Sequence, residues 1–139
     1  MAHVPVLLNE VLEILDLRPG KFVVDGTLGG GGHAIEIIKK ISPNGCFLGI
    51  DRDDSAIQSF KEKVRQPTCN TKIFLANDNY SNVRKILKEK KLGKADGLLL
   101  DLGFSSDQLQ AGRGFSFLKP DDLLLMTYSD KEKPLYEVL

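Results

Sequence analysis

Four short apolar runs, separated by segments with helical periodicity, constrain the fold of this chain more than any other feature. The runs are KFVVDGT, CFLGIDRD, TKIFLAND and ADGLLLDLG, and each ends in a polar or glycine cluster. The first three are rich in aromatic or β-branched residues, and we interpret all four runs as buried strands. Each intervening segment is long enough for a crossover helix, so we expect an α/β fold with a parallel, doubly wound sheet.

Apolar residues at helical spacing predict three crossover helices and a further helix ahead of the sheet. The crossover helices are expected to start near Gly32, to cover residues 53–64, with Asp53 or Asp54 as N-cap, and to run from about Ser81 to Lys90. The helix ahead of the sheet, here called the leading helix, is expected to cover residues 4–16, with Pro5 in its first turn. Its expected apolar face consists of Leu7, Leu8, Val11, Leu12 and Leu15.

The organisation along the chain is therefore a leading helix, βα units over residues 21–103, and a loop region over residues 104–139. The fourth apolar run is as apolar as a central strand, yet the chain supplies little that could lie beside it. Because an exposed apolar edge promotes association, we expect this chain to be the front part of a longer protein.

Charge and composition exclude some classes of function. The chain has 139 residues, the size of one domain, and Lys plus Arg and Asp plus Glu both number 19. A basic field over the whole protein, of the kind that binds nucleic acid, is therefore absent. A local basic patch remains, and we interpret it as a solvated helix face, with an RNA contact as the alternative. It comprises Arg84, Lys85, Lys88, Lys90, Lys91 and Lys94.

The ends of the chain and its cysteines carry no targeting or metal signal. The N-terminus has no basic region and carries Glu10 and Glu13, which argues against a secretory signal. Cys46 and Cys69 are isolated and lack a metal-ligand spacing, so we expect reduced thiols and no metal. No apolar run approaches the length of a membrane span. We therefore expect a cytoplasmic protein that does not enter the membrane.

The stretch VVDGTLGGGGHA, residues 23–34, directly follows the first predicted strand. In an open parallel sheet this is the edge at which ligands bind. A single glycine would suffice for a tight turn from strand to helix, since glycine permits positive φ. Four consecutive glycines instead indicate that a ligand approaches the backbone closely.

Two classes of ligand fit this loop. Gly29, Gly31 and Ala34 match the dinucleotide fingerprint, and Asp51 follows at the distance of a ribose-binding acid. Asp25, however, would repel a pyrophosphate, whereas it could lie near the ammonium and sulfonium groups of S-adenosylmethionine. The same carboxylate could instead cap the turn by accepting backbone N–H bonds. The loop alone therefore favours a methyl donor without excluding a dinucleotide.

Asp101 ends the fourth apolar run and is a second candidate at the same edge. In amino-methyltransferases a residue in this place can accept a hydrogen bond from the target amine, which helps to localise the nitrogen lone pair. The usual Pro-Pro-aromatic sequence is absent. Ser105 and Ser106 offer hydroxyls, for which hydrogen bonding within the loop is the simpler role.

Taken together, these motifs resemble the bacterial 16S ribosomal RNA (cytosine-N4) methyltransferase H family, RsmH or MraW. The matching blocks span nearly the whole chain in order. They are His3–Leu8, Asp25–Thr27, Gly31–His33, Ile50–Asp53, Asp96–Gly97, Asp101–Ser106, Gln108–Leu109 and Arg113–Phe117. The blocks from Asp101 onward are far more specific than a glycine loop.

The resemblance implies a Rossmann-like class I methyltransferase fold with S-adenosyl-L-methionine as cofactor. It implies methyl transfer to N4 of a cytidine in the decoding region of 16S ribosomal RNA within the small ribosomal subunit. The cofactor contacts that it implies are Gly31, Gly32, His33, Asp51, Tyr80, Asp101 and Gln108. Asp101 is also the candidate catalytic residue.

Two departures from the family pattern qualify this expectation. Family members are roughly twice as long, and the missing part would supply the remaining strands and an inserted substrate domain. After GFSF many members read Pro-Leu-Asp-Met-Arg-Met-Asp, whereas residues 122–128 read DLLLMTY and lack that Asp and Arg. Two alternatives therefore stay open: an NAD-type dinucleotide-binding, dehydrogenase-like domain, and a non-catalytic methyltransferase remnant.

Overall fold

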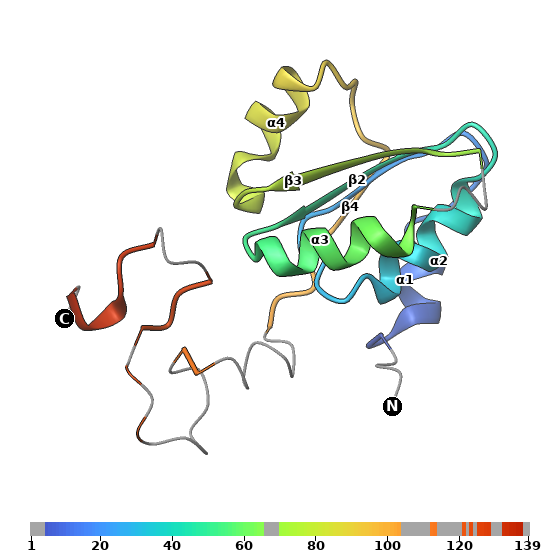
Figure 1. The fold of residues 1–139 in the computed structure, drawn as a ribbon. Helices are drawn as coiled ribbons and strands as arrows, with labels where there is room; N and C mark the ends of the chain where they lie inside the picture. The colour runs from blue at the N-terminus through green and yellow to red at the C-terminus, as the bar shows by residue number, and fades with distance from the viewer. Residues whose placement is uncertain are drawn as a thin grey trace. The chain divides into compact units, whose positions relative to one another are not determined.

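The computed structural model describes residues 5–65, 70–103, 112–113, 121, 123, 125–128 and 132–137. The chain divides into two compact units, Met1–Asp101 and Leu102–Leu139. The first unit holds the sheet and its helices (Figure 1). Within the described part of the second unit, one short 3-10 helix forms at Leu135–Glu137.

The sheet is parallel throughout, as the alternation of strands and helices predicts. Its strands are β1 (Phe22–Asp25), β2 (Cys46–Asp51), β3 (Lys72–Asn77) and β4 (Gly97–Leu99). They lie in the order β3-β2-β1-β4. In register, Val24 of β1 lies between Leu48 of β2 and Leu98 of β4. All four strands therefore end at the same edge.

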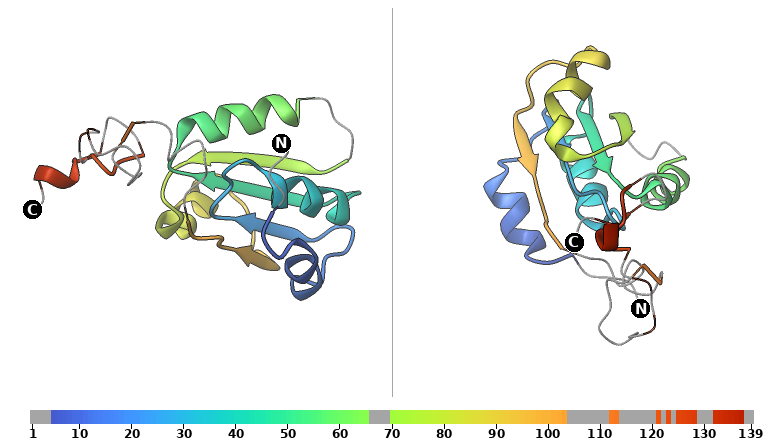
Figure 2. Two further views of the ribbon diagram at one scale, coloured as in Figure 1. Left: turned by 90° about the horizontal axis from the view of Figure 1, so that it is seen from below. Right: turned by 90° about the vertical axis from the view of Figure 1, so that its left-hand side faces the viewer.

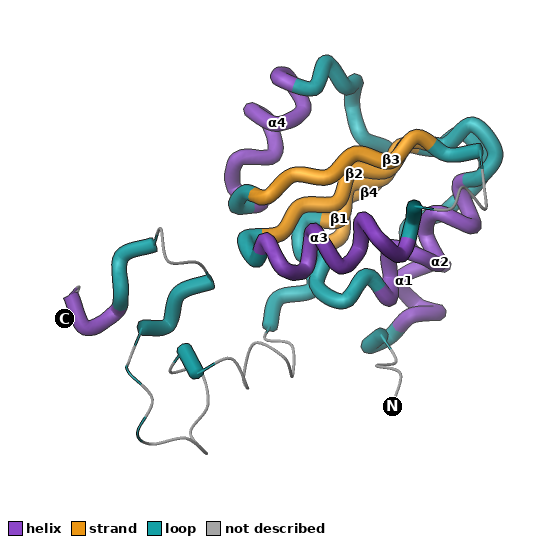
Figure 3. Tube along the Cα trace, viewed as in Figure 1, coloured by secondary structure: helices purple, strands orange, loops and turns teal. Residues whose placement is uncertain are grey.

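Helices cover both faces of this sheet. The helices α1 (Leu8–Ile14), α2 (Gly32–Ile41) and α3 (Asp54–Lys63) lie on one face, and α4 (Val83–Glu89) lies on the other (Figures 1, 2 and 3). The core on the three-helix side includes Ile37, Ile41, Phe47 and Phe60. The core under α4 includes Phe22, Val24, Leu48, Ile50 and Ile86.

The leading helix is shorter than residues 4–16. It begins at Leu8, because Leu7 adopts a left-handed conformation (φ 51°) that a helix cannot contain. The side chain of Leu7 is 64% exposed, so it is not part of the apolar face. Pro5 lies outside the helix and packs against Gly32, where an added Cβ would lie 2.5 Å from its Cγ. Leu12 and Leu15 do pack on the core as expected.

The prediction of four buried strands is wrong for two of them. β1 and β2 are inner strands and are largely buried, whereas β3 and β4 lie at the sheet edges and are only partly covered. On β4 and just after it, Leu98 and Leu100 are 50% and 41% exposed. The apolar edge that the fourth run predicts is therefore present in the described part of the chain.

In the described part of the second unit, Arg113 contacts the segment 122–128, whose sequence differs from the family pattern. The carbonyl of Arg113 accepts a hydrogen bond from the Met126 N–H at 2.7 Å, and its guanidinium donates to the Thr127 hydroxyl at 3.4 Å. Thr127 is buried. The segment that lacks the family's charged residues thus still bonds to Arg113.

Within the described residues, no helix combines the length and the apolar content that crossing a bilayer requires.

Candidate functional site

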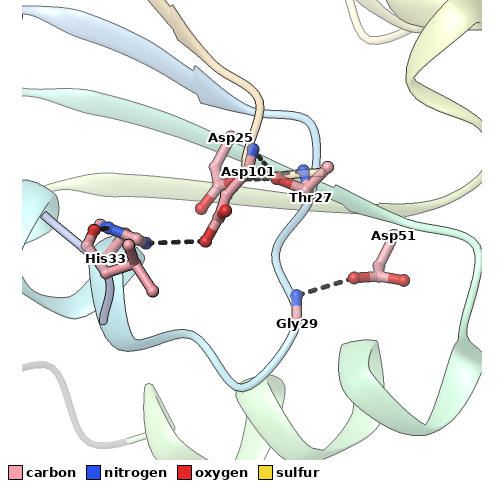
Figure 4. A network of polar contacts seen from close by, with 7 residues as sticks. Asp25, Thr27, Gly29, His33, Asp51 and Asp101 are labelled. Carbon is pink, nitrogen blue, oxygen red and sulfur yellow. Dashed lines mark hydrogen bonds and ion pairs between the residues drawn. The ribbon is translucent and has the colours of Figure 1, made fainter. Parts of the chain in front are cut away.

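The segments that follow β1, β2 and β4 bring polar side chains together at the carboxyl edge of the sheet (Figure 4). Asp25 ends β1, Asp51 ends β2, and Asp101 lies just beyond β4. The glycine loop connects Asp25 to α2, whose first residues are Gly32 and His33. This is the edge at which open parallel sheets bind ligands.

The glycines of the loop have two different environments. A Cβ at Gly31 would lie 2.2 Å from the Phe60 ring, at a φ of +77°, and one at Gly26 would lie 2.5 Å from Leu100. Packing against the buried Phe60 ring therefore requires glycine at position 31, whereas at Gly26 and Gly32 a side chain would displace Leu100 or Pro5. A Cβ added at Gly30 would meet no atom within 4 Å, and one at Gly29 would lie 3.8 Å from its nearest neighbour, the Thr27 carbonyl oxygen. Only this part of the loop is open to an approaching group.

Asp51 anchors the open part of the loop. Its Oδ2 accepts a hydrogen bond from the Gly29 N–H at 2.7 Å, and its Oδ1 accepts one from the Asp53 N–H at 2.9 Å. Burial raises the pKa of this carboxyl, and the two N–H donors oppose that rise. A carboxylate offers about four acceptor sites, so Asp51 can still accept a further donor such as a ribose hydroxyl.

Asp25 is a buried carboxyl beneath the loop. It is 1% exposed, and its Oδ1 accepts a hydrogen bond from the Thr27 N–H at 3.0 Å. Burial raises the pKa of Asp25 to about 6, while the Thr27 N–H and nearby His33 oppose the rise. The expectation that Asp25 could bond the backbone of the turn is confirmed. Because it is 1% exposed, this carboxyl can act on a ligand through its charge rather than by direct contact.

Thr27 ties the glycine loop to the segment after β4. Its Oγ1 accepts a hydrogen bond from the Asp101 backbone N–H at 2.7 Å. The Asp101 side chain is about half exposed, and its Oδ2 lies 3.8 Å from Nδ1 of His33. Sequence reasoning missed this role of Thr27. The only local signal was a hydroxyl residue two positions after a strand-terminal acid.

His33 is held in one tautomer by the segment ahead of α1. Its Nε2 lies 2.9 Å from the carbonyl oxygen of Val6, which can only accept, so Nε2 carries the proton. In the neutral ring Nδ1 is then an acceptor, and it faces the carboxylate of Asp101 (Figure 4). Two acceptors that face each other need a donor between them or a proton on one of them.

The site is consequently rich in acceptors. Asp25, Asp101 and Nδ1 of His33 converge on one side of the loop. Among the described residues, no lysine or arginine forms an ion pair with Asp25 or Asp101. Lys63 lies nearby, where it donates to the carbonyl of Gly30 at 2.8 Å. The described residues contain no group of three or more His, Cys, Asp or Glu that could hold a metal ion.

Tyr80 lies beside the loop, and other expected contacts cannot be placed. Tyr80 begins the 3-10 helix Tyr80–Asn82, is 38% exposed, and has its Cβ 3.0 Å from where a Cβ on Gly26 would lie. With this exposure, Tyr80 is not part of the buried core. Gln108, Ser105 and Ser106 lie outside the described residues.

We predict that Gly31→Ala lowers the free energy of unfolding by about 3 kcal/mol, because the methyl group meets the Phe60 ring at a positive φ. Gly30→Ala, the matched control, should change it by less than about 1 kcal/mol, because the space there is open. Urea denaturation of both variants measures the difference. Equal destabilisation of the two would show that the loop does not pack in this way.

Comparison with known proteins places the chain in a family. The sequence profile described as the MraW methylase family matches residues 1–138. A curated relative from Dictyoglomus thermophilum is 45% identical over 128 residues, which cover 91% of this chain and 42% of the relative. A second relative, from Syntrophus aciditrophicus, is 44% identical over 138 residues, which cover 99% of this chain and 43% of the relative. Both are named ribosomal RNA small subunit methyltransferase H, and the chain spans less than half of their length.

Solved structures support the fold. A putative rRNA-methylase from Clostridium thermocellum superposes with a TM-score of 0.61 at 22% identity, over 76% of this chain and 57% of that one. TrmN from Thermus thermophilus superposes with a TM-score of 0.60 at 21% identity, over 79% of this chain and 30% of TrmN. The expected Rossmann-like methyltransferase fold is thereby confirmed. Because the family profile covers nearly every residue, the chain belongs to the MraW methylase family.

Proposed function

We propose that this chain carries the cofactor-binding part of an S-adenosylmethionine-dependent ribosomal RNA methyltransferase. The reaction is methyl transfer to N4 of a cytidine in the decoding region of 16S ribosomal RNA, within the small ribosomal subunit in the cytoplasm. Family membership and the names of the curated relatives support this proposal. Residues 1–139 then form the front part of a methyltransferase domain, whose remaining strands and inserted substrate domain lie outside this chain.

The gathering of hydrogen-bond acceptors at the carboxyl edge of the sheet is the structural observation that best supports the proposal. S-adenosylmethionine presents an ammonium and a sulfonium, and the edge presents Asp25, Asp101 and the Nδ1 lone pair of His33. These groups fit a cationic ligand. A pyrophosphate at the same place would face two carboxylates without a paired cation, so a dinucleotide is not favoured.

The residues assigned to the cofactor have distinct proposed roles. The first turn of α2 has no side-chain cap, so the backbone N–H groups of Gly32 and His33 are suited to donate to a carboxylate. Asp51 would hold the ribose, and Tyr80 would stack on the adenine. Gly31 and Gln108 complete the proposed set, although packing against Phe60 is itself a sufficient reason for glycine at position 31.

Asp101 is the proposed catalytic residue. When bound, the cofactor supplies an electrophilic methyl group. The amine of cytosine is a poor nucleophile because its lone pair is delocalised into the ring, and a carboxylate that accepts its N–H helps to localise that pair. The bond from the Asp101 N–H to Thr27 fixes the backbone from which this carboxylate projects. Half-exposure of the side chain leaves it accessible to a substrate base.

Calorimetric titration of the chain tests the proposal. We expect heat of binding with S-adenosylmethionine or its demethylated product and none with NAD. Binding of NAD alone would overturn the proposal in favour of the dinucleotide alternative. A methylation assay on small subunits that lack the mark addresses the remnant alternative, because restoration of the mark by this chain alone would exclude it.

Asp51→Ala should weaken S-adenosylmethionine binding by about 1–3 kcal/mol, since the variant cannot form hydrogen bonds to a buried ribose. Asp53→Ala is the matched control. It removes the side chain that caps α3 by accepting from the Ser55 N–H at 2.9 Å, and it should leave the affinity nearly unchanged. Titration of both variants, with their unfolding free energies measured in parallel, separates ligand contact from stability. Unchanged affinity in Asp51→Ala would remove this residue from the site.

Asp25 should make folding stability depend on pH. Its pKa is raised from 3.8 to about 6 in the folded chain, so the folded state binds this proton more tightly than the unfolded state. The resulting stabilisation is present below the lower value and is lost as the pH rises through the higher one, by about 3 kcal/mol. Asp25→Asn should show a correspondingly flatter profile in urea denaturation between about pH 4 and pH 7. If the wild-type chain and Asp25→Asn showed the same pH dependence of stability, a group other than Asp25 would be responsible for it.

The same substitution separates the two ligand classes. Asp25→Asn removes the negative charge while its amide oxygen can still accept the Thr27 N–H. We expect it to weaken S-adenosylmethionine binding above about pH 6 and to spare or improve any binding of NAD. Titration at two pH values provides the measurement. Tighter S-adenosylmethionine binding to the variant would contradict the electrostatic argument.

A further inference from the structure

The strongest local charge in the described chain lies away from the candidate site. Residues 84–94, here called the basic segment, carry six basic side chains against one acid, a net charge of +5. Lys plus Arg and Asp plus Glu balance over the whole chain, so the remaining residues carry a net charge of −5. Positive potential is therefore concentrated around this segment.

The basic segment is held on the surface by its apolar residues. It spans most of α4 and the connection to β4, on the face of the sheet opposite α1, α2 and α3 (Figure 1). Ile86, Leu87 and Leu92 pack into the core under α4. All six basic residues are exposed. Arg84 and Lys88 lie one turn apart, so they share one exposed face of the helix.

Five of the six basic side chains of the basic segment form no ion pair with another described residue. In α2, Lys39 pairs with Glu36 at 2.7 Å, and after α3, Arg65 pairs with Glu62 at 3.0 Å. In the basic segment, the contact of Lys85 with Glu89 at 3.9 Å is the one ion pair among described residues. Intrahelical pairing, one way in which a solvated helix face is balanced, therefore involves one of the six basic residues.

Lys91 occupies a position that ordinarily favours glycine. The Leu92 N–H donates to the Leu87 carbonyl at 2.9 Å, and the Lys91 N–H donates to the Lys88 carbonyl at 3.1 Å. This is the Schellman pattern, in which Lys91 is the left-handed residue, with a φ of 53°. Glycine would adopt this conformation at lower cost. The chain thus keeps a positive side chain where backbone geometry alone does not favour one.

We propose that the basic segment binds the phosphate backbone of RNA. Phosphates are repelled from the carboxyl edge, where Asp25, Asp51 and Asp101 gather, so within this chain any attraction for an RNA substrate comes from another surface. The basic segment supplies unpaired, exposed cations with the reach of lysine side chains. These contacts hold RNA without reading its sequence. The identity of the partner as RNA rests on the proposed function.

Fluorescence anisotropy with a short labelled single-stranded RNA tests this proposal in the full chain without cofactor. The double variant K88E/K91E should bind roughly tenfold more weakly at low salt. Its plot of log affinity against log salt concentration should also be less steep, by about 0.7 for each phosphate that the variant no longer neutralises. The matched control K40E/K61E reverses two exposed lysines of α2 and α3, near the C-terminal ends of their helices, and should retain affinity.

A third variant separates binding from folding. K91G removes the charge and suits the left-handed conformation, so the midpoint of unfolding should stay the same or rise while RNA affinity falls. The proposal is wrong if the wild-type chain does not bind RNA at low salt, or if both double variants lose affinity equally. It is also wrong if K88E/K91E loses binding to anionic lipid vesicles but not to RNA. Failure of S-adenosylmethionine to bind, with RNA binding intact, would instead count against the proposed cofactor.

Discussion

Burial of the Asp25 carboxyl beneath the glycine loop is the constraint on which the candidate site depends. A desolvated carboxyl needs donors, and the Thr27 N–H supplies one. That bond positions the Thr27 hydroxyl, which accepts the Asp101 N–H and so joins the loop to the segment after β4. The N–H of Gly29, bonded to Asp51, joins the same loop to β2. One buried acid is therefore linked through the loop to the other two.

The distribution of charge follows from this arrangement. Parallel strands that end in aspartate gather negative charge at one edge, and the unpaired cations of the basic segment lie on a helix covering one face of the same sheet. A cationic cofactor and an anionic substrate would each be attracted to a different part of the molecule. A chain with zero net charge can thereby bind ligands of both signs, which its overall composition does not reveal.

Much of the fold could be predicted from sequence, because strand runs, helical periodicity and the Asp53 cap are local signals. Burial of β3 and β4 could not, since it depends on which strands become neighbours. The start of α1 was missed because nothing local marks Leu7 as left-handed. The contacts of Thr27 with Asp101 and of His33 with Val6 join distant segments, so only the folded backbone reveals them. The acids themselves were predictable as candidates because each directly follows an apolar run.

The most direct test of the acceptor-rich site is to determine by nitrogen NMR which ring nitrogen of His33 carries the proton. The chain contains two histidines, so the His33 ring can be assigned with a single variant. We predict that the neutral ring carries its proton on Nε2, and that S-adenosylmethionine shifts the Nδ1 resonance whereas NAD does not. A neutral ring protonated on Nδ1, or a shift of this resonance with NAD but not with S-adenosylmethionine, would contradict the proposed site.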